Sequence, residues 1–199
     1  MEPPGIRSQT SALSLEEWAS LPEEVPGELV DGALAEEELP SYVHEFVIAW
    51  LLHALLGWVL PRGGFAGGSE AKFAVAAGRG RKPDLSVYFP GRRPPATARL
   101  ISTPPDIVVE VVTATPADAR RDRVDKLRDY ARFGVRYYWL VDPELRTFEV
   151  LELGADGRYV HALAEELGVV SPPGCEGLRI DLSALWTEVD RLLAGGAGA

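Results

Sequence analysis

The sequence predicts an α/β fold, a mixed β-sheet flanked by helices. Two kinds of evidence support this class: β-branched apolar runs typical of buried strands, and capped apolar segments typical of helices. Their order along the chain, helix, three strands, helix, two strands, indicates a mixed sheet. The chain has 199 residues, enough for a core without disulfides, and its single cysteine, Cys175, excludes a disulfide framework or a Cys/His metal cluster within one chain.

The first part of the chain predicts an extension, a hairpin and a helix. Residues 1–26 are rich in proline, and only the stretch SLEEWASL predicts a short helix there. The segment GELVDGALAEEE predicts a hairpin, because Asp31-Gly32 is a strong turn signal. Ser41 can cap a helix that runs to about Leu60 and is apolar on nearly all sides, which indicates a central, buried helix. We expect His53 to be a core histidine of that helix.

The second part predicts strands on both sides of another helix. Strands are expected over residues 69–76, 85–89, 107–113, 136–141 and 147–153. The helix between the third and fourth of these has clear edges: Thr115 as cap, Pro116 in the first turn, Asp118 three residues after the cap, and Gly134 at the end. Its expected inward stripe is Val124, Leu127 and Ala131. Loops and a short helix over 182–193 complete the chain.

These signals predict one domain with short additions. We expect an extension over residues 1–26, a single domain over 27–193 and a disordered Gly/Ala tail over 194–199. The apolar run at 46–60 is only 15 residues long and ends at Pro61, so it is shorter than a bilayer span requires. The N-terminus lacks the features of a signal peptide, which predicts a cytoplasmic protein without a membrane partner.

Charge is distributed unevenly along the chain. The net charge of −10 argues at first against nucleic acid as a partner, because phosphate contacts need Lys and Arg. Residues 46–141, however, hold fifteen Lys and Arg against eight Asp and Glu, so this segment is +7 in an otherwise acidic chain. The central segment is therefore the candidate for a nucleic-acid contact.

One letter interrupts the most apolar strand. The stretch DIVVEVVTATP places Glu110 in the middle of a β-branched run, where an ionised carboxylate is costly unless a cation or hydrogen bonds meet it. Asp84 opens a neighbouring strand directly after Pro83. One or two carboxylates completed by water and substrate phosphate are typical of a Mg²⁺ site. A bound divalent cation would offset the burial of Glu110 and could activate a water for phosphodiester hydrolysis.

A cationic helix follows the Glu110 strand. Lys126 lies on it and could sit beside an attacking water or the charge developing on a phosphate. The alternative without a catalytic role is a surface ion pair between Asp122 and Lys126, which are spaced four residues apart. The same helix carries several arginines that could follow a nucleic-acid backbone: Arg120, Arg121, Arg123, Arg128 and Arg132.

Together these motifs resemble the Uma family of proposed endonucleases, within the restriction-endonuclease-like PD-(D/E)XK superfamily. The resemblance rests on GELVDG, a histidine at the start of an apolar helix, KPDLSVYF, DIVVEVVTATP and DRVDKLRDYARFGVRYYWLVDP, and it covers roughly residues 28–159. It implies a restriction-endonuclease-like mixed sheet flanked by helices. It also implies a phosphodiesterase dependent on Mg²⁺ or Mn²⁺, and DNA as the substrate.

The resemblance also assigns residues. It implies that Asp84 and Glu110 are the metal ligands and catalytic acids. The lysine of the superfamily motif should fall at position 112, which is Val112 here, and the family pattern instead implies Lys126 on the following helix. Asp122, together with Glu28 and His44, matches further polar positions of the family. These three are accessory candidates.

The residues leave two other functions open. A protein that keeps this fold but only binds nucleic acid or a protein partner is consistent with the missing lysine at Val112 and with the acidic balance. Another phosphate ester, such as RNA or a nucleotide, could also be the substrate. Cleavage of duplex DNA by this fold often involves two protomers, so a homodimer is a further expectation.

Overall fold

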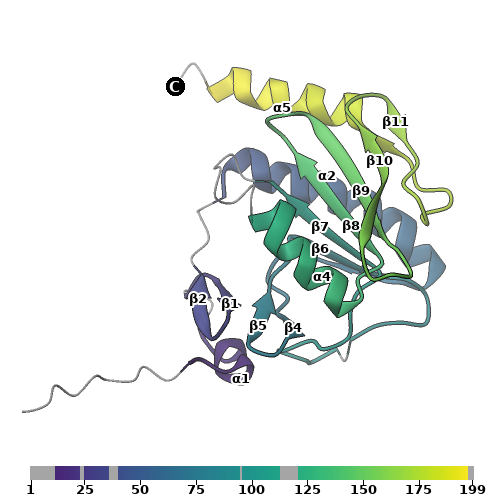
Figure 1. Cartoon of the computed structure of the whole chain (residues 1–199). Coiled ribbons are helices and arrows are strands. Elements are labelled where there is room, and N and C mark those ends of the chain that lie inside the picture. Colours follow the sequence, from purple (N-terminus) through teal and green to yellow (C-terminus); the bar gives the residue numbers. More distant parts are fainter. Residues whose placement is uncertain (1–11, 23–24, 36–39, 95, 113–120, 197–199) are drawn as a thin grey trace, which may run out of the picture.

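The computed structural model describes residues 12–22, 25–35, 40–94, 96–112 and 121–196 (Figure 1). A central sheet has the strand order β10-β9-β8-β7-β6-β3. Neighbouring strands pair antiparallel except β7 and β8, which are parallel and joined by a helical crossover. The six strands are β3 (Phe65–Gly67), β6 (Leu85–Tyr88), β7 (Ile107–Val111), β8 (Tyr137–Asp142), β9 (Thr147–Leu153) and β10 (Tyr159–Glu165).

Two smaller sheets lie beside it. One has the order β2-β1-β5-β4, and the other pairs β11 with β12. Their strands are β1 (Glu28–Val30), β2 (Ala33–Ala35), β4 (Phe73–Ala76), β5 (Arg79–Arg81), β11 (Val169–Val170) and β12 (Ile180–Asp181). The hairpin between β1 and β2 turns at Asp31 and Gly32, which both have positive φ, as the Asp-Gly pair predicts.

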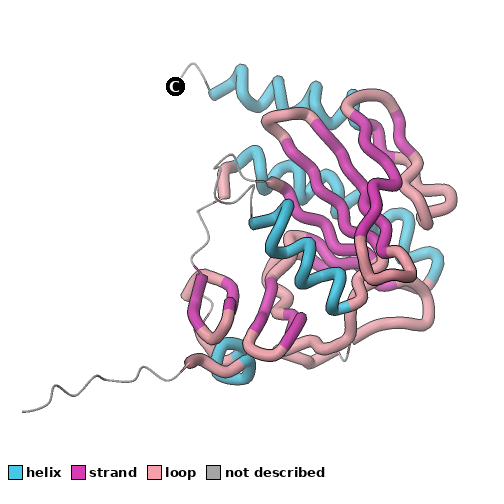
Figure 2. Tube along the Cα trace, viewed as in Figure 1, coloured by secondary structure: helices cyan, strands magenta, loops and turns pink. Residues whose placement is uncertain are grey.

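Helices cover both faces of the central sheet (Figure 2). They are α1 (Leu15–Ala19), α2 (Tyr42–Val59), the short turn η1 (Leu60–Arg62), the π-helical segment η2 (Arg121–Lys126), α4 (Leu127–Phe133) and α5 (Leu182–Gly196). Ser41 caps α2 by accepting the His44 amide hydrogen, as its position predicts. Gly134 ends α4 in the left-handed conformation.

Alternate residues of β7 face two different cores. Ile107, Val109 and Val111 pack with α2 and α5, whereas Val108 and Val112 pack on the side covered by α4. Glu110 lies two residues from both Val108 and Val112, and its side chain points to the same face as theirs, because successive side chains of a strand point to opposite faces. The alternation of side chains along β7 therefore places Glu110 under α4.

Most predicted elements are confirmed, and several were missed. The strands over 85–89, 107–113, 136–141 and 147–153 and the helices after Ser41 and near 182–193 are present within a few residues. Three of the missed strands, β3, β5 and β11, are too short to show an alternating pattern of apolar and polar residues. The expectation of loops after residue 153 was wrong, because β10 pairs with β9 over seven residues.

Two predictions about burial were also wrong. The helical segment after β7 buries Asp122, Lys126, Asp129 and Tyr130 most deeply, while the expected stripe of Val124, Leu127 and Ala131 is only half-buried. His53 is exposed and is not a core residue. The expected cap Thr115, with Pro116 and Asp118, lies outside the described residues.

Among the described residues, one helical stretch, Tyr42–Arg62, is long and apolar enough to cross a membrane. Of its apolar 18-residue window, 39% is buried within the protein. Val47, Leu51, Leu55 and Val59 on its inner side are fully buried in the core against the sheet. Helices of this composition are also found in the cores of soluble proteins.

Helix α1 is fastened to the smaller sheet by one side chain. Trp18 is 1% exposed, and its indole N–H donates to the Gly27 carbonyl at 3.2 Å. A Cβ at Gly80 would overlap the Trp18 ring, so only glycine lets β5 approach it this closely. Residues before the hairpin therefore contribute to the fold of the small sheet.

We predict that Trp18→Ala lowers the free energy of unfolding by about 3 kcal/mol, because it empties a fully buried aromatic site. Urea denaturation measures this change. Glu16→Ala, in the same helix but exposed, is the matched control and should shift the midpoint little. A loss below about 1 kcal/mol for Trp18→Ala would mean that α1 is dispensable.

Candidate active site

Glu110 is the centre of a buried polar cluster. It is 2% exposed on β7, and both of its carboxylate oxygens accept hydrogen bonds. Lys126 Nζ donates to Oε2 at 2.9 Å, and the Tyr130 hydroxyl donates to Oε1 at 2.7 Å. The buried carboxylate of Glu110 is therefore compensated by an ammonium and a hydroxyl, both from the crossover helix.

Asp84 lies next to Glu110 at the end of a strand pair. Leu85 is opposite Val109 in the β6-β7 ladder, so Asp84 falls beside Glu110 one position further along. Its Oδ2 accepts the Val111 amide hydrogen at 2.7 Å, and its side chain is 15% exposed. The hydrogen bond to the backbone of β7 holds the carboxylate at the mouth of the cluster.

Lys126 faces three carboxylates at once. Its ammonium lies 2.9 Å from Glu110 Oε2, 3.3 Å from Asp122 Oδ1 and 3.7 Å from Glu28 Oε1. Asp122 and Lys126 are 6% and 5% exposed, so the alternative of a surface ion pair is wrong. The π-helical turn carries both side chains inward, and such turns are frequent at functional sites.

Tyr130 belongs to the cluster and was missed by sequence reasoning. It is 1% exposed and, one turn beyond Lys126 on the helix, faces the same carboxylate. A signal for it existed, because Asp122, Lys126 and Tyr130 recur at intervals of four residues. An apolar-stripe search passes over this periodicity, because two of the three residues are charged.

A second layer of ion pairs anchors the cluster to the small sheet. Arg81, 1% exposed on β5, donates to Glu28 Oε2 at 2.6 Å and to Asp129 Oδ2 at 2.7 Å. Glu28 Oε1 also accepts the Lys82 amide hydrogen at 2.8 Å. Arg79 extends the chain from Asp129 to Asp31. The hairpin acid Glu28 is thus tied both to α4, through Arg81 and Asp129, and to Lys126.

The charges of this cluster shift one another's pKa. Burial raises the pKa of Glu110 well above its usual value; Lys126 opposes the shift, and Asp84 and Asp122 add to it. Burial likewise raises the pKa of Asp122 against the pull of Lys126. Burial lowers the pKa of Lys126, but Glu110, Glu28 and Asp122 outweigh it, so the net pKa is raised. Burial thus opposes ionisation of the two acids, while the ammonium of Lys126 favours it.

His44, in the first turn of α2, contacts Asp84. Its Nε2 is 3.4 Å from Asp84 Oδ2, and its buried Nδ1 has no hydrogen-bond partner, although Glu45 Oε1 is 3.5 Å away. Burial lowers the pKa of His44, but the hydrogen bond and charge of Asp84 outweigh it and leave the pKa raised. The structure thus brings all six predicted site acids, bases and cations into one cluster: Glu28, His44, Asp84, Glu110, Asp122 and Lys126.

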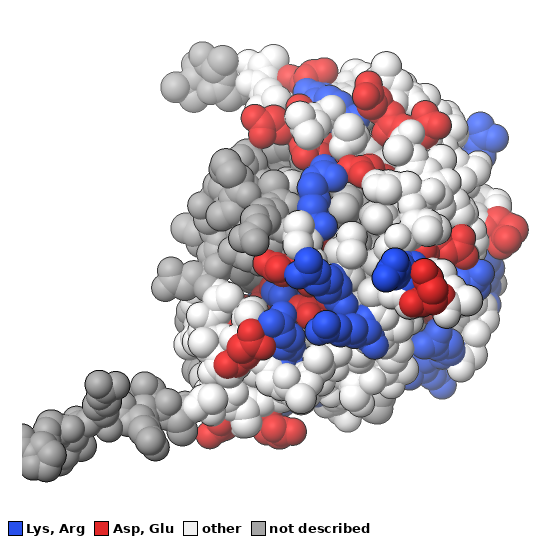
Figure 3. Space-filling model, in the orientation of Figure 1, with Lys and Arg blue, Asp and Glu red and all other residues white. Residues whose placement is uncertain are grey.

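The predicted backbone-contacting arginines have different environments. Arg128 and Arg132 are exposed on α4, on a face where Lys and Arg side chains gather (Figure 3). Arg123 is instead half-buried and paired with Glu149 at 2.6 Å and Asp142 at 3.5 Å. Arg120 and the side chain of Arg121 lie outside the described residues.

The donor chemistry of the cluster fits a hard divalent cation. Carboxylate oxygens are the ligands Mg²⁺ and Mn²⁺ prefer. The pKa values of Glu110 and Asp122 are raised first by burial and further by the neighbouring carboxylates, so a bound cation would favour their ionised forms. Within the described ranges, no group of three or more His, Cys, Asp or Glu side chains is arranged to hold a metal by itself. The fit is therefore to a site of one or two carboxylates, with Asp84 and Glu110 as the donors.

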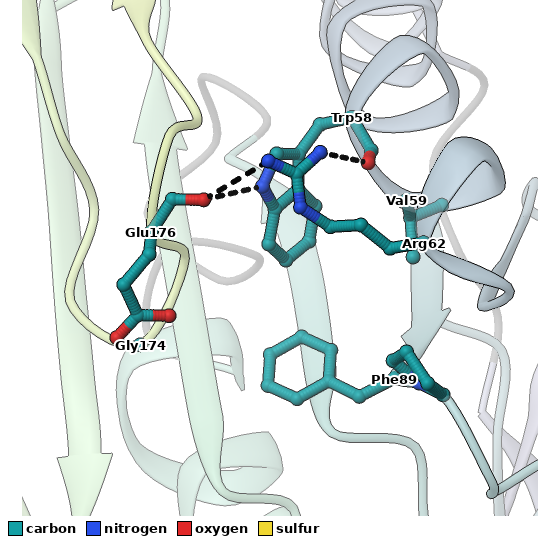
Figure 4. A pocket seen from close by; sticks show the side chains of 7 residues that line it. Trp58, Val59, Arg62, Phe89, Gly174 and Glu176 are labelled. Carbon is teal, nitrogen blue, oxygen red and sulfur yellow. Dashed lines mark hydrogen bonds between the residues drawn. The ribbon is translucent and has the colours of Figure 1, made fainter.

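A separate cavity lies at the far end of α2. It has a volume of about 190 Å³ and is lined by Trp58, Val59, Arg62, Phe89, Pro90, Gly174 and Glu176 (Figure 4). The polar groups of the cavity wall hydrogen-bond to one another: the Trp58 indole and the Arg62 guanidinium both donate to the Glu176 carbonyl. None of the clustered acids or Lys126 lines this cavity.

The mixed sheet with helices on both faces defines an α/β protein of the restriction-endonuclease-like fold. The crystal structure of "a putative nuclease belonging to DUF820" from Anabaena variabilis ATCC 29413 matches with a TM-score of 0.72 and 20% sequence identity. The match covers 89% of this chain and 99% of the other, and at this identity it establishes the fold alone.

The family follows from the sequence match. The model of the Uma2 family, described as "Putative restriction endonuclease", matches residues 14–183, and the chain belongs to this family. A search of curated proteins found no match. Family and fold together indicate a protein of the restriction-endonuclease-like class.

We predict that Lys126→Met destabilises the protein by about 3 to 5 kcal/mol near neutral pH, because it leaves buried carboxylates without their cation. In the unfolded chain the carboxyl of Glu110 ionises near pH 4.5. Burial raises its pKa in the folded protein, and loss of Lys126 raises that pKa further. Stability should therefore fall as pH rises above 4.5, by up to about 1.4 kcal/mol per pH unit.

Urea unfolding of the variant and wild type between pH 5 and 8 measures this slope. Arg128→Met, on the exposed side of α4, is the control and should follow the wild-type profile. Adding Glu110→Gln to Lys126→Met should flatten the dependence. An unchanged slope in Lys126→Met would show that the ammonium does not compensate Glu110.

Proposed function

We propose that this protein is an endonuclease dependent on Mg²⁺ or Mn²⁺ that hydrolyses phosphodiester bonds of DNA in the cytoplasm. The observation that carries the proposal is the buried contact between Lys126 and Glu110 beside Asp84. Family membership and fold support the reaction class. A purely structural ion pair would not require a second carboxylate held at the mouth of the cluster by the backbone of β7.

Asp84 and Glu110 would hold the cation. When bound, a divalent ion polarises the phosphate and lowers the pKa of a coordinated water. Asp84 is suited to this role because the Val111 amide leaves its Oδ1 free of any hydrogen bond among the described residues. Glu110 is suited because its burial makes the exchange of a proton for a cation favourable.

Lys126 would serve the phosphate. Its ammonium stays charged, because the surrounding carboxylates raise its pKa, and it can hydrogen-bond a phosphate oxygen or the attacking water. Tyr130 and Asp122 fix the position of this side chain and of Glu110. Glu28, held by Arg81, would help to position Lys126.

We predict that wild-type protein with Mn²⁺ cleaves plasmid DNA, and that Glu110→Ala and Lys126→Ala each lower the rate by about 100-fold or more. Plasmid nicking measures the rate. Glu152→Ala, which removes a partly exposed carboxylate from the same sheet, is the matched control and should leave the rate unchanged.

Calorimetry with Mn²⁺ separates a nuclease from a protein that has the fold but only binds nucleic acid or a partner. Wild type should bind Mn²⁺, and Glu110→Ala should lose that binding event. Cleavage that survives Glu110→Ala, or that needs no metal, contradicts the assigned site. DNA binding without cleavage or Mn²⁺ binding would favour the binding protein instead, and cleavage of RNA alone would change the substrate.

We also predict that Arg128→Ala weakens DNA binding uniformly across sequences and lowers the slope of log K against log salt by about one unit. The physical reason is the loss of one phosphate contact from the exposed side of α4. Fluorescence anisotropy at several salt concentrations measures it. Arg191→Ala on α5 is the control, and an equal effect there would show that α4 is not the contact surface.

A further inference from the structure

A buried tyrosine on β8 reaches the backbone of the crossover segment. Tyr138 is 0% exposed, and its hydroxyl donates to the main-chain carbonyl of Asp122 at 2.9 Å. Tyr138 lies opposite Val108 in the parallel β7-β8 ladder and belongs to the core on the α4 side. Its side chain therefore points from the sheet to the same face as Glu110.

The acceptor of this hydrogen bond belongs to the π-helical segment η2. Asp122 is the second residue of η2 and Lys126 is its last. The two side chains point into the cluster together, with Lys126 Nζ 3.3 Å from Asp122 Oδ1. The position of the η2 backbone sets which carboxylates the ammonium can reach. A hydrogen bond to that backbone therefore bears on the placement of Lys126.

The carboxylates around Lys126 do not hold η2 in the same way. Glu110 on β7 and Glu28 on β1 contact the ammonium at the end of a long, flexible side chain. Asp122 lies on the same segment as Lys126 and moves with it. The hydroxyl of Tyr138 fixes the segment more directly, because β8 is an inner strand paired with both β7 and β9.

Tyr138 contacts the crossover helix a second time. Its ring centroid is 5.3 Å from that of Tyr130, whose hydroxyl donates to Glu110. Tyr138 thus contacts the helix at Asp122 and at Tyr130, four residues before and four residues after Lys126. Burial raises the pKa of Tyr138 well above its usual value, and Glu110 and Asp122 add to the shift. The hydroxyl therefore keeps its proton and remains a donor.

Arg123 provides another attachment of η2 to the sheet. Its guanidinium lies 2.6 Å from Glu149 on β9 and 3.5 Å from Asp142 on β8. The side chain of Arg123 is 33% exposed, so water screens this ion pair. The fully buried hydrogen bond of Tyr138 is not screened in this way, and it is the more rigid of the two attachments.

A hydroxyl that bonds a carbonyl is not by itself a sign of function, because buried tyrosines usually find such a partner. The Tyr159 hydroxyl donates to the Val135 carbonyl at 2.7 Å, and the Tyr88 hydroxyl donates to the Thr103 carbonyl at 2.7 Å. Neither acceptor lies on η2 or in the cluster. The position of its acceptor is what distinguishes Tyr138 from these two.

We propose that Tyr138 is a positioning residue whose hydroxyl holds η2 on the sheet so that Lys126 reaches Glu110. Tyr138 does not touch the substrate, because its side chain is fully buried. The expected effect on cleavage rests on the proposed function. The effect on the placement of Lys126 does not, and it can be measured in the absence of any nuclease activity.

Steady-state nicking of plasmid DNA with Mn²⁺ tests the role in cleavage. Tyr138→Phe, which removes only the hydroxyl, should lower kcat at least about tenfold, because Lys126 is then misplaced, and should change KM less than about twofold. Tyr159→Phe is the matched control and should change neither constant; its ring packs on Tyr138 at 5.9 Å. In a Lys126→Ala background, adding Tyr138→Phe should lower the rate no further.

Chemical labelling tests the placement of Lys126 directly. The chain has three lysines, Lys72, Lys82 and Lys126, so mass spectrometry after brief acetylation resolves each of them. Lys126 is 5% exposed and should react slowly in the wild type. Tyr138→Phe should raise its rate relative to the other two lysines at least about tenfold, because η2 opens more often. Tyr159→Phe should leave this ratio unchanged.

The two measurements separate the positioning role from the proposed function. Cleavage by Tyr138→Phe at the wild-type kcat, or labelling of Lys126 at the wild-type rate, would overturn the positioning role. Equal changes in Tyr159→Phe would also overturn it, because general loss of packing would then explain both results. If the wild type itself does not cleave DNA, the proposed function fails, and the labelling ratio alone decides whether Tyr138 places Lys126.

Discussion

The contact between Lys126 and Glu110 is the interaction on which the site depends. A carboxylate in the middle of a buried strand destabilises the sheet unless a cation reaches it, and here that cation comes from the crossover helix. The contact therefore fixes how the helix lies on the sheet, and it does so through charge more than through apolar packing. The half-buried Val124, Leu127 and Ala131 alone would allow other placements.

The smaller sheet acts as a support for that contact. Arg81 spans Glu28 and Asp129, so the hairpin and α4 are held by one guanidinium in a fixed two-sided geometry. Glu28 Oε1 then lies 3.7 Å from the ammonium of Lys126, which also contacts Glu110. Charges buried this deeply are seldom retained for stability alone, since apolar replacements are often as stable. Their arrangement is better explained by the need to hold three carboxylates around one ammonium.

How far the sequence could predict this site differed from residue to residue. Glu110 was visible because it breaks an apolar strand, Asp84 because it opens a neighbouring strand after Pro83, and Lys126 because it lies on the helix that follows. The resemblance added Glu28 and His44. Tyr130 was not found, because a tyrosine on an amphipathic helix is usually interpreted as a core residue. Arg81 was not found, because it lies on a strand of three residues, which is too short to show periodicity. The missing lysine at Val112 is explained by geometry: Val112 joins the core under α4, and Lys126 brings the positive charge to Glu110 from the helix.

The same limit applies to α2. Composition shows that a helix is apolar on all sides, but it does not say whether the sheet or another molecule removes each side from water, since the hydrophobic effect depends only on the area buried. Val47 and Leu51 face the sheet, while Ala49, His53 and Gly57 face outward. A helix read as central can therefore lie at the surface of one chain.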